Sequence, residues 1–101
     1  MKSEIRKFVD YMQNEKRLSS NTINSYTKNL TQFFDYVDKP VSDISHENIL
    51  NYLAQLNKEN CKVSTSNQKL STLKSFFKYM LREKICNTNP AELIECAKNG
   101  T

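Results

Sequence analysis

Apolar residues recur at steps of three and four along most of this chain, the spacing that places them on one face of an α-helix. The clearest stripe contains Leu70, Leu73, Phe77, Met80 and Leu81. One glycine and two prolines leave few positions for tight hairpin turns, and no stretch alternates convincingly between apolar and polar residues. The sequence therefore predicts an all-α fold.

Capping and helix-breaking residues divide this pattern into a compact bundle of four main helices and a short C-terminal helix. The expected helices cover about 3–16, 20–38, 46–59 and 64–83, and the short one runs from 90 to about 97. Residues that can accept hydrogen bonds from a first helical turn precede the last four helices. They are Ser19 or Ser20 for the second helix, Ser45 with Asn48 for the third, Ser64, Thr65 or Ser66 for the fourth, and Asn89 before Pro90 for the last.

Length and cysteine content favour a single intracellular domain. A chain of 101 residues has the usual size of one compact domain. The N-terminus becomes amphipathic at once, and no apolar run is long enough to cross a membrane. Three widely spaced cysteines, Cys61, Cys86 and Cys96, include no Cys-x-x-Cys pair. We therefore expect a cytoplasmic monomer with reduced thiols, no metal and no cofactor.

Positive charge is concentrated on the fourth expected helix and the loop before it. Six cations and one acid lie between Lys62 and Lys84, so this stretch carries +5, whereas the whole chain carries +4. Charge gathered on one element indicates a polyanionic partner, although a solvated face with scattered lysines would give a similar count.

The side of this helix opposite its apolar stripe is polar and basic, and the second helix has a similar outer face. Short hydroxyl and amide side chains let a helix approach a duplex closely, whereas lysines reach phosphates. Lys69 points away from this face, beside Phe76, and ranks below Lys74 and Lys78. The candidate DNA-contacting residues are Ser19, Asn21, Thr22, Asn24, Ser25 and Lys28 on the second helix and Asn67, Gln68, Ser71, Lys74, Ser75, Lys78 and Arg82 on the fourth.

Several motifs, in this order and spacing, resemble the core-binding, SAM-like domain of tyrosine recombinases, the family of phage integrases and Xer-type recombinases. They are Leu18–Tyr26 (LSSNTINSY) with Leu30 and Phe33, then Ile44, Ile49, Tyr52, Leu53 and Leu56, then Leu70–Met80 (LSTLKSFFKYM), and finally Asn89-Pro90 with Ile94. The resemblance implies a helical bundle whose second and fourth helices approach the major groove of double-stranded DNA.

The resemblance also implies which parts of a recombinase this chain lacks. In the family a separate catalytic domain supplies cationic residues and a tyrosine nucleophile. Here there is one histidine, His46, which we expect to be solvated, and the arginines are Arg6, Arg17 and Arg82. We therefore expect residues 1–97 to form the core-binding domain and 98–101 to begin a linker to an absent catalytic domain. Such a chain would bind DNA without cutting it, and other recombinase protomers would join it only in the full-length protein.

Two other functions fit the residues. A helical protein-interaction module would use Phe76 and Tyr79, because Phe76 lies off the main stripe and could be exposed. A helix-turn-helix regulator would need a short turn, often with glycine, and a dimer to read paired half-sites. Gly100, the one glycine, lies beyond the last expected helix, which makes the regulator less favoured.

Overall fold

Within residues 2–95, four α-helices follow one another, with one turn of 3-10 helix between the second and the third. The structure is a computed structural model and describes residues 2–95. The helices are α1 (Lys2–Asn14), α2 (Ser20–Val37), α3 (His46–Lys58) and α4 (Val63–Arg82), and η1 (Val41–Asp43) joins α2 to α3. No strand occurs among the described residues, and each main helix begins and ends within two residues of its expected boundary. The all-α prediction is confirmed.

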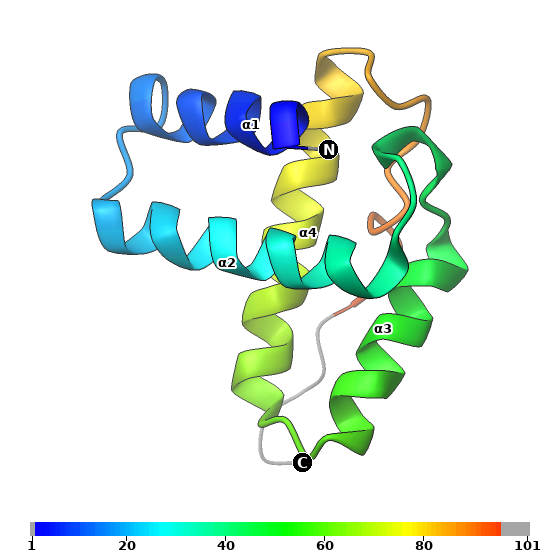
Figure 1. Cartoon of the computed structure of the whole chain (residues 1–101). Coiled ribbons are helices and arrows are strands. Elements are labelled where there is room, and N and C mark those ends of the chain that lie inside the picture. Colours follow the sequence, from blue (N-terminus) through cyan, green and yellow to red (C-terminus); the bar gives the residue numbers. More distant parts are fainter. Residues whose placement is uncertain (1, 96–101) are drawn as a thin grey trace.

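Helix α4 is the central element of the bundle. In Figure 1, α1 and α2 form an antiparallel pair, α4 crosses this pair, and α3 lies beside the N-terminal half of α4. Contacts join α4 to each of the other three helices. Because three helices pack against α4, its buried side chains extend beyond the single apolar stripe seen in the sequence.

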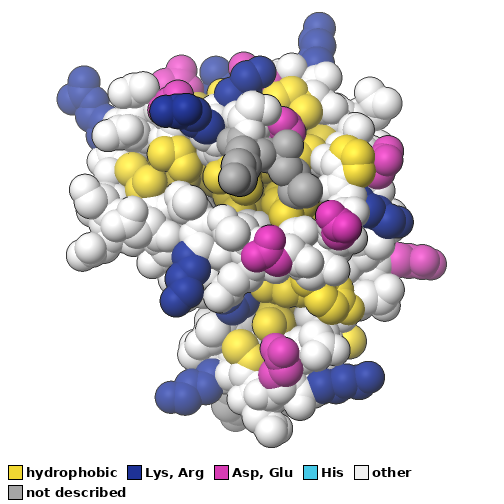
Figure 2. All heavy atoms as spheres, viewed as in Figure 1, with side chains coloured by type: hydrophobic (Ala, Val, Ile, Leu, Met, Phe, Trp, Pro, Cys, Tyr) yellow, Lys and Arg dark blue, Asp and Glu magenta, His cyan; other side chains and the backbone are white. Residues whose placement is uncertain are grey.

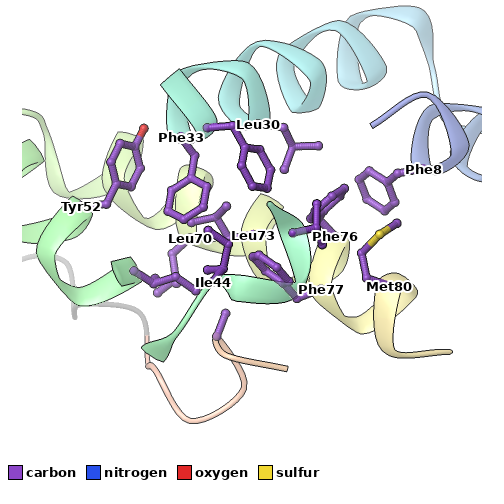
Figure 3. Packing of buried hydrophobic residues seen from close by; sticks show 14 of the residues in the cluster. Phe8, Leu30, Phe33, Ile44, Tyr52, Leu70, Leu73, Phe76, Phe77 and Met80 are labelled. Atoms are coloured by element: carbon purple, nitrogen blue, oxygen red, sulfur yellow. The ribbon is translucent and has the colours of Figure 1, made fainter. Parts of the chain in front are cut away.

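Aromatic rings fill the core where these helices meet (Figure 3). Phe76 has none of its surface exposed, and its ring meets that of Phe8 edge-on, with the centroids 5.4 Å apart. The suggestion that Phe76 could dock a partner helix was therefore wrong, because α1 covers that side of α4. Leu81, expected in the core stripe, is instead 38% exposed. Because α1 packs against α4, the buried side of α4 includes Phe76 and leaves Leu81 partly exposed.

The expected N-caps of α2 and α3 are confirmed, but that of α4 is not. The Ser19 side chain accepts a hydrogen bond from the Thr22 backbone amide, and Ser45 and Asn48 form a reciprocal capping box. Helix α4 begins at Val63, two residues earlier than a Ser64 cap would allow, and the Ser66 amide bonds to the Lys62 carbonyl at 2.9 Å. Lys62 occupies the N-cap position and makes no side-chain capping bond.

The expected short C-terminal helix does not form within the described residues. Residues 90–93 make consecutive turns, in which the Glu92 amide bonds to the Asn89 carbonyl and the Ile94 amide to the Ala91 carbonyl. Asn89 does act as a local cap, because its Oδ1 accepts from the Ala91 amide at 3.0 Å. The end of the expected helix, at Ala97, and the expected linker at 98–101 lie outside the described residues.

Four non-glycine residues provide the left-handed conformations that follow the helices. Arg17, Asp38, Asn60 and Lys84 have φ angles between 51° and 62°. Glycine usually occupies such positions because it has no Cβ to clash with the backbone. This chain ends its helices without it, which explains how a sequence with one glycine still forms a bundle of short-looped helices.

Candidate nucleic-acid interface

The outer face of α2 presents small polar side chains to solvent. Asn21, Asn24 and Lys28 are exposed, whereas Thr22 and Ser25 are half-buried. The Ser19 and Thr22 hydroxyls lie 3.0 Å apart and hydrogen-bond to each other. These two hydroxyls are thus engaged in capping the helix, and the three exposed side chains are the better placed candidates for contacting a ligand.

The corresponding face of α4 is exposed along three turns. Gln68, Ser71, Ser75 and Lys78 are exposed, and Lys74 is half-buried. No ion pair engages Lys74 or Lys78 in the part of the chain that the structure describes, although the exposed Glu92 borders the same hollow as both lysines.

Asn67 is separated from this group. It borders a hollow of about 220 Å³ with Leu53 and Asn57, on the side of α4 that faces α3. The structure thus brings most of the α4 candidates together and places Asn67 apart from them.

The polar flanks of α2 and α4 meet where the two helices cross. Asn29 Nδ2 donates to Thr72 Oγ1 at 3.1 Å, and Lys69 Nζ donates to Asn29 Oδ1 at 3.2 Å and to Gln32 Oε1 at 2.5 Å. We call Asn29, Gln32, Lys69 and Thr72 the interhelical seam. Its bonds join the flank of α2 that carries Ser25 to the flank of α4 that carries Gln68.

Sequence reasoning missed the seam. It placed Lys69 beside Phe76 and away from the contact face, whereas the Lys69 ammonium lies on the boundary between α2 and α4. The sequence did contain one indication of the seam. Asn29 is polar but lies between Tyr26 and Leu30, on the side of the helix that faces the core. That signal marks a buried polar group without identifying its partner.

A hollow of about 530 Å³ lies between α1, the start of α2 and the C-terminal half of α4. Leu18 and Tyr26 border it from the α2 side, and Ser75, Lys78 and Arg82 border it from α4. Its aromatic lining consists of Phe8, Tyr11, Tyr26 and Tyr79. Figure 2 shows apolar side chains at the surface in the strip between α1 and α2. Side-chain hydrogen bonds therefore join the two flanks at the crossing point, whereas this hollow places the C-terminal part of the α4 flank beside Leu18 and Tyr26.

Arg82 is bound within the protein to a greater extent than the lysines. Its guanidinium lies 3.6 Å from a Glu15 carboxylate oxygen and 3.7 Å from one of Glu83, and 5.3 Å from the centroid of the Tyr11 ring. An anionic ligand would have to compete with these carboxylates. Arg82 is accordingly a weaker candidate than Lys74 or Lys78.

Charges of both signs occur on the molecular surface. In the view of Figure 2, Lys and Arg side chains are interspersed with Asp and Glu side chains, so this face is not uniformly basic. Because residues 62–84 carry +5 and the whole chain carries +4, attraction of a polyanion would come from this stretch rather than from the molecule as a whole.

The described residues contain no group of three or more His, Cys, Asp or Glu that could hold a metal ion. His46 is exposed, as expected, and its Nδ1 lies 3.3 Å from the Pro90 carbonyl oxygen. Within residues 2–95 no helix is both long and apolar enough to cross a membrane.

Burial favours the neutral form of two tyrosines, Tyr52 and Tyr79. Burial, with smaller contributions from Cys61 and Glu59, raises the pKa of Tyr52 to about 12. Burial followed by the charge of Glu83 also raises the pKa of Tyr79. A nucleophilic phenol needs the opposite environment, in which several cations stabilise the developing charge.

The helical fold and the paired polar flanks define a small helical domain with a polar, locally basic surface, and comparison with known proteins identifies its family. The pattern described as "Phage integrase, N-terminal SAM-like domain" matches residues 5–84, so the chain belongs to this family. The resemblance seen in the sequence motifs is confirmed.

Curated relatives of this chain are tyrosine recombinases. The chain is 31% identical over 103 residues to the tyrosine recombinase XerC of Natranaerobius thermophilus, covering 97% of this chain and 34% of the relative. It is 36% identical over 97 residues to the XerC of Leptospira interrogans, covering 92% and 31%. The chain spans about a third of the length of the curated relatives it matches.

Proposed function

We propose that this domain binds double-stranded DNA through a surface formed by α2 and α4, as the DNA-clamping part of a longer site-specific tyrosine recombinase. On this proposal the chain supplies affinity and position, while cleavage and the pairing with other recombinase protomers belong to other parts of the protein. The family membership supports the recombinase context.

The observation that carries the proposal is the junction of the two polar flanks at the interhelical seam. A duplex presents a groove bordered by two rows of phosphates, so a binding surface must place small polar groups between cations. On α2 the small polar groups are Asn21 and Asn24 and the cation is Lys28. On α4 the small polar groups are Ser71 and Ser75 and the cation is Lys78. The seam bonds join the two helices that carry these sets.

The number of free cations implies weak binding. Lys28, Lys74 and Lys78 are the exposed or half-buried candidates without an ion pair in the described residues. Each phosphate contact adds affinity by releasing counterions, and three such contacts give non-specific binding that is micromolar or poorer at physiological salt. The isolated domain should thus bind DNA in a strongly salt-dependent way.

The tyrosines support a role in binding rather than in strand cleavage. Tyr52 is buried, with a pKa raised to about 12. The Tyr11 and Tyr79 rings stack with their centroids 4.3 Å apart, under the guanidinium of Arg82. Because Arg82 is already paired with carboxylates, it is a poor substitute for the cationic cluster that a phenolate leaving group or nucleophile requires.

Charge reversal on α4 tests the proposal. Lys74→Glu with Lys78→Glu should abolish binding of a labelled duplex in fluorescence anisotropy at low salt, while the circular dichroism and thermal midpoint stay close to those of the parent. The matched control is Arg6→Glu with Lys39→Glu, both at exposed positions outside α2 and α4. Both variants lower the net charge from +4 to zero, because each replacement of a cation by glutamate lowers the charge by two. Equal loss of binding in the two variants, or none in either, would refute the assignment of the surface to α4.

A further inference from the structure

The Lys69 ammonium lies at the boundary of α2 and α4 without an acidic partner. It donates to Asn29 Oδ1 at 3.2 Å and to Gln32 Oε1 at 2.5 Å, and both acceptors are neutral amide oxygens. An ammonium has three N–H donors, so these two bonds leave one donor and the whole positive charge available. No carboxylate forms an ion pair with Lys69 among residues 2–95.

The position of this ammonium is fixed by buried groups. Asn29 is 7% exposed and Thr72 is fully buried, and the hydrogen bond between them holds the Asn29 amide in one orientation. Thr72 Oγ1 in turn donates to the Gln68 carbonyl at 3.0 Å. Because an ammonium only donates, the Asn29 oxygen must face Lys69 while its nitrogen faces Thr72.

A lysine held in this way loses little conformational freedom when it binds an anion. Lys74 and Lys78 lie on the outer face of α4, and ordering such a side chain on binding costs conformational entropy. Lys69 is already held by two hydrogen bonds in the free protein, so binding an anion would cost it little further conformational entropy. A pre-positioned, uncompensated cation between two helices is suited to an anion that reaches both of them.

We propose that Lys69 binds one backbone phosphate of the duplex at the interhelical seam, with its third N–H directed to a phosphate oxygen. This inference rests on the proposed function, since the phosphate is part of the DNA that α2 and α4 approach. It adds a residue that sequence reasoning had directed away from the contact face. It also gives the seam a second role, because the bonds that join the helices also orient the ligand-binding group.

The salt dependence of binding tests this role, because a purely structural lysine would not change it. The probe is a labelled duplex measured between about 50 and 200 mM salt, where the logarithm of the binding constant falls by about 0.9 per phosphate contact for each tenfold rise in salt. Lys69→Met keeps the aliphatic stem and removes the charge. We expect its slope to be shallower by about 0.9 and its affinity at low salt to be about tenfold lower.

Two further variants keep the test decisive. Lys39→Met removes a charge from an exposed position after α2 and should leave the slope unchanged. Lys69→Arg restores the charge and should restore the slope even if Lys69→Met folds poorly. The inference is overturned if Lys69→Met keeps the parent slope, or if Lys69→Arg has the slope that a missing contact would give. If the parent binds duplex and the α4 charge reversal abolishes binding, either result refutes the Lys69 phosphate contact alone. A parent that does not bind at low salt refutes the proposed function itself.

Discussion

Replacing Thr72 by valine keeps the size and branching of the side chain and removes its hydroxyl. That hydroxyl accepts the bond from Asn29 Nδ2 at 3.1 Å, in a position with no solvent exposure. In Thr72→Val the Asn29 amide nitrogen loses this bond and, being buried, has little access to water. The variant therefore tests whether the polar seam contributes to the attachment of α2 to α4.

The expected destabilisation follows from the burial of both partners. Leaving a buried donor without its acceptor costs about 1–3 kcal/mol. Taking about 2 kcal/mol, and about 4–8 °C per kcal/mol for a domain of this size, we expect the melting temperature to fall by about 8–16 °C. Thermal and urea unfolding followed by circular dichroism at the helical band measure both quantities.

Thr31→Val is the matched control. Thr31 is also a helical threonine that donates to the carbonyl four residues earlier, that of Thr27 at 2.9 Å, but it lies exposed on α2. It should change stability by less than about 0.5 kcal/mol, as surface substitutions usually do. If Thr72→Val destabilises the domain no more than Thr31→Val does, the seam bond contributes nothing and the reasoning is refuted.

Two further predictions concern titratable groups. The pKa of Tyr52 is about 12 in the folded state, whereas its ordinary value is 10.0. The unfolded chain therefore loses this proton first as the pH rises. We expect Tyr52 to lower the free energy of unfolding by on the order of 2 kcal/mol between about pH 10 and 12. Alkaline unfolding of the parent and of Tyr52→Phe measures this, and parallel stability curves would contradict it. Burial, with a smaller contribution from Glu4, raises the pKa of Cys86, which is a buried thiol, whereas Cys61 is only half-buried. A thiol reagent at pH 8 should therefore label Cys61 at least about tenfold faster than Cys86. Single-cysteine variants that also carry Cys96→Ser measure the two rates, and equal rates would show that Cys86 is not protected.

Local patterns in the sequence were sufficient to predict the helices. The steps of three and four from Leu70 to Met80 define α4, and the hydroxyls of Ser19 and Ser45 mark the starts of α2 and α3. These features depend on neighbours within one turn, which a single sequence contains. The start of α4 was displaced because Lys62 supplies only its backbone carbonyl, and that interaction has no side-chain signature.

The contacts between helices could not be predicted in the same way. Phe76 appears peripheral on an isolated helix, but α1 packs over it, and the crossing of α2 and α4 brings Asn29 to Thr72 across 43 positions of the sequence. The position of Lys69 follows from that crossing. The candidate face could therefore be predicted as two lists of residues, whereas their junction depends on the angle at which the two helices pack.

The most direct test of the account is a titration of the isotope-labelled domain with duplex DNA, followed by the backbone amide signals of each residue. We expect the amides of 21–28 in α2 and 68–78 in α4 to shift together at the same DNA concentration, with α3 unaffected. Shifts confined to one of the two helices, or centred on α3, would contradict a single binding surface made by α2 and α4.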